Sequence, residues 1–79
     1  MDHTAVINDQ LDRFPGINMR SLELASKVFL YQRKIAAPGS EITPHDIEIF
    51  FSRFKSTDVL VSWLADIDIE TLKRVHAAS

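Results

Sequence analysis

The three histidines are the residues of this chain best suited to acid–base or metal chemistry near neutral pH. They are His3, His45 and His76, and none has a second histidine three or four residues away. A zinc site needs three or four ligands at defined spacing, and ligands on one helix face are separated by three or four residues. His45 and Asp46 are adjacent and leave a helix at different angles. The histidines therefore predict no metal site.

The acidic residues between positions 66 and 70 resemble the beginning of an EF-hand calcium loop. Such a loop requires glycine at its sixth position and glutamate at its twelfth. This chain has Thr71 and Ala77 at those positions, so the calcium loop is excluded. We instead interpret Asp68 as the N-cap of a last helix.

Motifs for nucleophilic catalysis and phosphate binding are also missing from the sequence. No serine lies in a nucleophile elbow, and the only two glycines are Gly16 and Gly39. Phosphate-binding loops need several closely spaced glycines. A chain of 79 residues has little room for a water-excluding pocket. We therefore expect no enzymatic activity, no cofactor and no small-molecule substrate.

The composition indicates one small helical domain over residues 1–79. Hydrophobic residues make up 46% of the chain, the net charge is −2, and there is no cysteine. This apolar content is ample for a core, and the lack of disulfides fits a reducing compartment. The sequence has neither a signal peptide nor an apolar stretch long enough to span a membrane. We expect a soluble cytoplasmic protein without membrane contacts, and the sequence leaves open whether residues 1–16 pack tightly.

Residues 42–54 contain the clearest helix start. Thr43 is a favourable N-cap, and Pro44 follows at the first helical position, where its missing N–H has no cost. Asp46 can bond back to the cap and close a capping box. The apolar residues that follow have the spacing of one helical face: Ile47, Phe50, Phe51 and Phe54. The pattern predicts a helix over about residues 44–54.

Four further segments show helical spacing: residues 3–13, about 19–36, about 57–65, and a segment beginning after Asp68. The segment 19–36 is apolar over more than one seam, which predicts a long central helix with several neighbours. Within it, Glu23 precedes Lys27 by four residues, the spacing of a favourable ion pair. The segment 57–65 follows 44–54 after a short break, so these two are expected to pair antiparallel. The predicted fold is all-α, a compact bundle of four to five short helices.

The pair 44–54 and 57–65 also has about the lengths of a helix-turn-helix DNA-binding motif. The break between them lacks the usual glycine, and Asp58 would face phosphates from the second helix. That helix also contains no Arg, Lys, Asn or Gln to read bases. Phosphate contacts would have to come from other basic residues: Arg20, Lys27, Arg33, Lys34, Arg53 and Lys55. A DNA-binding transcriptional regulator is the alternative function.

The strongest functional indication is the apolar surplus on segment 57–65, where hydrophobic side chains cover much of the helix circumference. Such a helix needs burial on all sides, and in a small domain a partner has to supply part of it. We therefore predict a non-enzymatic regulator or adaptor that binds another protein or forms a homodimer. The predicted contact residues are Trp63, Leu60, Val61 and Tyr31, with Arg33 and Lys34 on the polar rim.

Overall fold

The computed structural model describes residues 3–78, which form five α-helices and no strand. The predicted all-α bundle with a long central helix is thereby confirmed. The helices are α1 (Thr4–Arg13), α2 (Met19–Ala36), α3 (Pro44–Ser52), α4 (Thr57–Ala65) and α5 (Ile69–Ala78). Only α3 ends clearly earlier than the sequence predicts. Its last turn tightens, because the N–H groups of Arg53 and Phe54 bond to the carbonyls of Phe50 and Phe51 at 3.2 Å.

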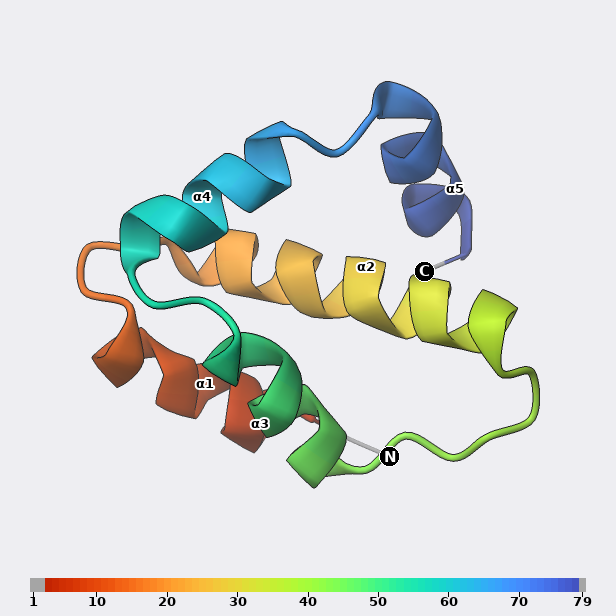
Figure 1. The fold of residues 1–79 in the computed structure, drawn as a ribbon, viewed down its shortest axis with the longest axis horizontal. Helices are drawn as coiled ribbons and strands as arrows, with labels where there is room; N and C mark the ends of the chain where they lie inside the picture. Colours follow the sequence, from red (N-terminus) through yellow and green to blue (C-terminus); the bar gives the residue numbers. More distant parts are fainter. Residues whose placement is uncertain (1–2, 79) are drawn as a thin grey trace.

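Helix α2 is the axis of the fold, and α1, α4 and α5 each pack against it. Figure 1 shows α1 antiparallel to α2, α4 over the N-terminal half of α2, and α5 across its C-terminal half. The predicted pair at 44–54 and 57–65 is present as α3 and α4, but in Figure 1 their axes cross instead of running antiparallel. The reason is that α3 packs on α1 whereas α4 packs on α2, so each follows a different neighbour.

The core is organised around the ring of Phe50 on α3. Its centroid lies 4.7 Å from that of Phe29 on α2, 5.0 Å from Phe51, 5.3 Å from Phe54 and 5.5 Å from Trp63 on α4. The Phe29 ring is stacked on Phe50, and the other three meet it at steep angles. These are the favourable geometries for aromatic pairs. One residue therefore joins α2, α3 and α4.

Helix α1 is an integral part of this core, which answers the question that the sequence left open for residues 3–16. Val6, Ile7 and Phe14 are buried, and the Phe14 ring lies 6.1 Å from that of Phe51. Gln10 is buried as well and satisfies its amide within α1. Its Nε2 donates to the Val6 carbonyl at 3.2 Å, and its Oε1 accepts from Arg13 at 3.3 Å. The rest of the domain 1–79, residues 1, 2 and 79, lies outside the described residues.

The caps predicted at Thr43 and Asp68 form, and α4 has a cap as well. The Thr43 hydroxyl accepts from the Asp46 N–H at 3.3 Å, and the Asp46 carboxylate accepts from the Thr43 N–H at 2.9 Å. Ser56 caps α4 through the Val59 N–H, and the Asp68 carboxylate accepts from the Thr71 N–H at 3.0 Å. A cap that the sequence analysis missed begins α2. There Asn18 accepts from the Arg20 N–H at 2.7 Å, and asparagine immediately before the helix was the available signal.

The turn between α1 and α2 fixes the beginning of α4. Gly16 has a φ of +80°, a left-handed conformation that residues with a Cβ rarely adopt. The chain reverses there, and the Thr57 hydroxyl donates to the Pro15 carbonyl at 2.9 Å. This bond joins residues 42 positions apart and holds the α4 N-terminus against the turn.

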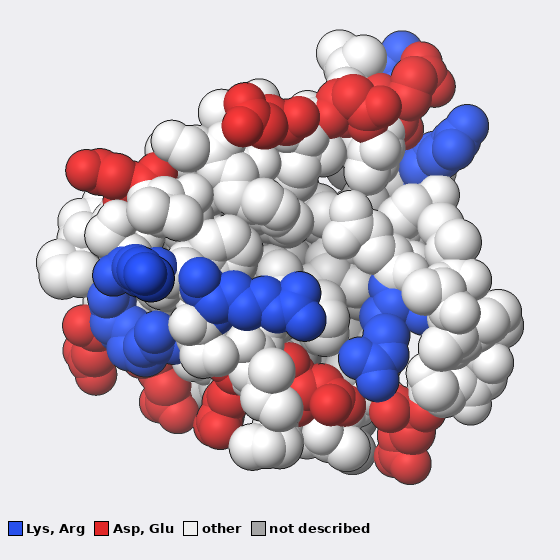
Figure 2. Space-filling model, viewed as in Figure 1, with Lys and Arg blue, Asp and Glu red and all other residues white. Residues whose placement is uncertain are grey.

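Charged side chains are unevenly distributed over the face seen in Figure 2. Lys and Arg gather in a band across its middle, whereas Asp and Glu lie along the upper edge, over α4 and α5, and along the lower edge. The net charge of −2 therefore conceals a local basic band.

We expect Leu60→Ala to lower the free energy of unfolding by about 2–5 kcal/mol, because Leu60 is fully buried beneath α4 and its truncation leaves a cavity. The matched control is the neighbouring Val61→Ala, at a side chain that is 47% exposed, which should change stability by no more than about 0.5 kcal/mol. Urea unfolding followed by circular dichroism measures both. Equal losses for the two variants would contradict the observed orientation of α4.

Acid should weaken the fold partly through Asp46. The Thr43 N–H and hydroxyl donate to its carboxylate and lower its pKa below the ordinary value. Because the folded-state pKa is depressed, this stabilisation is complete above the unfolded pKa of about 3.9 and is lost as pH falls through the lower folded value. The urea midpoint of the wild type should therefore fall more steeply below about pH 4 than that of Asp46→Asn. Parallel midpoint curves for the two proteins would contradict this role.

Candidate functional site

A groove runs along the side of α2 that the core does not use. It consists of three open hollows of about 530, 330 and 510 Å³. The first two share Lys27 and Val75, and the last two share Leu30 and Lys34, so the hollows lie next to one another along α2. The first two are walled by α2 and α5, and the third is closed by His3 and the loop after α2. We refer to this row of adjoining hollows as the α2 groove.

Helix α2 provides one wall through seven residues, among them Glu23 and Leu30. The other five are spaced alternately by four and three positions: Arg20, Leu24, Lys27, Tyr31 and Lys34. This alternation is the seam of a heptad repeat, which places all five side chains in one stripe along the helix. The opposite stripe of α2, with Leu22, Ala25 and Val28, is fully buried in the fold. The same helix therefore forms the core with one side and the groove with the other.

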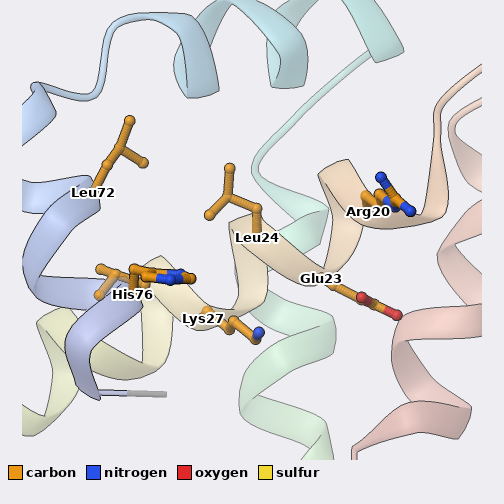
Figure 3. A pocket seen from close by; sticks show the side chains of 7 residues that line it. Arg20, Glu23, Leu24, Lys27, Leu72 and His76 are labelled. Carbon is orange, nitrogen blue, oxygen red and sulfur yellow. The ribbon is translucent and has the colours of Figure 1, made fainter.

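Helix α5 provides the second wall. Val75 is its one fully buried residue and anchors it on α2, while Leu72 is half-buried and His76 is exposed beside it. Figure 3 shows the groove with α5 on the left. Leu24 and Leu72 point to the same side, toward α4, and the His76 imidazole points from α5 toward α2. Apolar side chains thus face the hollow from both helices.

Among the described residues, the cations of the groove have no carboxylate partner. The only ion pair within 4.0 Å among residues 3–78 joins His45 to Glu48, on the surface of α3. The predicted pair of Glu23 with Lys27 does not form at that distance, although both line the groove. Side chains that extend into solvent gain little energy from a surface ion pair, and they lose conformational entropy when they form one.

The structure brings two of the predicted contact residues together and separates the others. Tyr31 and Lys34 line the same hollow of the α2 groove. Arg33 is one position away on α2 and lies outside all three hollows, and its charge acts on Asp46 of α3 instead. Val61 lies on the outer side of α4, 47% exposed.

Leu60 and Trp63 belong to the core of the protein. Leu60 has no exposed surface, so it is not available to a partner in this structure. Trp63 is half-buried, and its ring packs 5.5 Å from Phe50 and 5.4 Å from Phe54. This packing buries only part of the apolar surface of α4, because Val59 and Val61 stay close to half exposed.

Sequence reasoning missed the contribution of Arg20, Lys27 and Leu72 to this site. The first two were grouped with four other basic residues as possible phosphate contacts, yet two of these, Arg53 and Lys55, line none of the hollows. The spacing by four and three residues along α2 was the available signal for the α2 wall. Leu72 had no such signal, because its place beside α2 depends on how α5 packs.

The described part of the chain contains no group of three or more His, Asp or Glu residues that could hold a metal ion. None of its helices is long and apolar enough to cross a membrane. Comparison with protein-family models, curated proteins and solved structures finds no match for this chain. The functional argument is therefore made from the geometry of the groove.

Trp63→Ala should lower the free energy of unfolding by about 3 kcal/mol, at the low end for an aromatic truncation because the side chain is half-buried. The neighbouring Ser62→Ala, at an exposed position, is the control and should be neutral. Circular dichroism during urea unfolding measures both variants. It does not depend on the fluorescence of the indole that Trp63→Ala removes. A Trp63→Ala protein as stable as the wild type would mean that the indole is free for a partner.

Proposed function

We propose that this chain is a small non-enzymatic interaction module, a cytoplasmic regulator or adaptor that binds a segment of another protein. The observation that carries the proposal is the α2 groove. It exposes Leu24, Leu30 and Tyr31 on one wall and Leu72 on the other, in a fold whose core is complete without them. Concave sites lined mainly by apolar side chains with a few polar groups are typical binding sites.

The position of Tyr31 supports this assignment of the binding surface. Its side chain is half-buried at the border of the second hollow, beside Lys27 and Lys34. Tyrosine at the border between an apolar surface and a polar rim is a frequent anchor of protein interfaces. No aromatic contact of Tyr31 with the core cluster is present among the described rings, so its ring remains available.

The helix-turn-helix alternative has less support. The crossing of α3 and α4 in Figure 1 has the general form of such a motif, and Figure 2 shows a basic band. The first turn of α4 nevertheless carries Asp58, which would approach the phosphates with the wrong charge. Between Thr57 and Ala65 there is also no Arg, Lys, Asn or Gln, the residues that make the bidentate contacts with purines in the major groove.

Selection of helical peptides from an unbiased display library against the wild-type protein tests the proposal. We expect enriched peptides whose binding is lost in Tyr31→Asp or Leu72→Asp, since a charge in the apolar groove opposes burial. Val61→Asp on α4 is the matched control, and it should retain binding. Circular dichroism verifies the helical content of each variant.

Three outcomes would contradict the proposal. Loss of binding in Val61→Asp alone would place the interface on α4. A stable dimer in light scattering over a tenfold concentration range, abolished by Tyr31→Asp, would make the partner a second copy of the chain. A shift of duplex DNA that weakens steeply as salt rises, with no peptide enriched, would support the nucleic-acid alternative.

A further inference from the structure

The basic positions of the α2 wall repeat every seven residues, as do the side chains along one face of a helical ligand. Arg20, Lys27 and Lys34 are each seven residues apart, and Leu24 and Tyr31, also seven apart, alternate with them. With a rise of about 1.5 Å per residue, successive cations are about 10.5 Å apart along the axis. A partner helix lying along this seam presents one residue to each cation per heptad.

This spacing fits other extended ligands poorly. Side chains on one face of a β-strand recur every two residues, about 6.6–6.8 Å apart, so a bound strand would lose register with the cations. Duplex DNA carries one charge per about 1.7 Å of its axis, far denser than this row. Glu23 and Glu41 also line the groove and would repel a uniformly charged polyanion. A helical ligand can instead carry neutral or basic residues at the positions that face Glu23 and Glu41.

The cations are available for such a ligand. None of the three is in an ion pair within 4.0 Å among residues 3–78, and Arg20, Lys27 and Lys34 are all exposed. They alternate with the apolar floor of the groove, where a bound helix would exclude water and strengthen their attraction to carboxylates. His76 on α5, beside Lys27 in Figure 3, adds no negative charge to this part of the wall.

We infer that the ligand of the α2 groove is an acidic amphipathic helix of another protein. Its apolar residues at seven-residue spacing would contact Leu24 and Tyr31, and carboxylates at the same spacing would meet Arg20, Lys27 and Lys34. This inference rests on the proposed interaction function and specifies its ligand. The charges set the register and the choice of partner, while burial of the apolar positions supplies the larger part of the affinity.

Two designed peptides of about three heptads test this inference. They share the apolar positions and differ only in carrying Glu or Lys at the position that faces the cations. Fluorescence anisotropy should give a Kd about tenfold lower for the Glu peptide in 0.1 M salt, because three pairs on a partly desolvated surface each contribute modestly. Lys27→Glu and Lys34→Glu should each weaken the Glu peptide and strengthen the Lys peptide. The control is Arg53→Glu, outside the groove, which should leave both values within about twofold.

Equal binding of the two peptides, no binding of either, or unchanged affinities in Lys27→Glu and Lys34→Glu would overturn the inference. The display selection separates this failure from that of the proposed function. If peptides without acidic heptads are selected and depend on Tyr31, the groove is an interaction site with a different ligand. If no selected peptide depends on Tyr31 or Leu72, both the function and the ligand assignment fail.

Discussion

The contacts of the Phe50 ring hold this fold together. Phe29, Phe51, Phe54 and Trp63 all lie within 5.5 Å of it, so α2, α3 and α4 are joined at one point of α3. A chain of 79 residues without cysteine has few other means of fixing its helices. Aromatic side chains bury large surfaces with few rotatable bonds, which makes them efficient in a core this small. The orientation of Trp63 follows from this arrangement, since its indole completes the cluster.

The same arrangement explains why one side of α2 is left open. Phe29 and the buried stripe of α2 face the cluster, and α1 and α4 cover the helix on that side. What remains is the stripe from Arg20 to Lys34, which α5 covers in part and which the loop after α2 borders near Lys34. Because α5 is anchored mainly through Val75, it covers α2 incompletely and leaves the groove beside it. The groove thus results from a long central helix in a domain with too few neighbours to surround it.

A stripe that alternates apolar and basic residues is suited to reversible recognition. Leu24 and Tyr31 give a ligand an apolar surface to bury, but the three cations prevent the stripe from becoming an aggregation-prone patch when no ligand is bound. The charges also discriminate between ligands, because Arg20, Lys27 and Lys34 would repel a helix that carries basic residues opposite them. A ligand of the proposed kind would therefore be bound with modest affinity and with selectivity, as the proposed regulator or adaptor function requires.

Local sequence by itself determined the helices and where most of them begin. The capping box of Thr43 and Asp46, the cap at Ser56 and the cap at Asp68 use groups within three residues of each other, so no tertiary contact is needed to recognise them. The α2 wall of the groove also has a signal in the sequence, which is the heptad spacing of its residues. The tertiary structure alone decided that Leu60 is buried while Val61 is exposed, because a helix that is apolar all round does not specify its inner face. It also decided the crossing of α3 and α4 and the place of Leu72, which depend on contacts between residues distant in the chain.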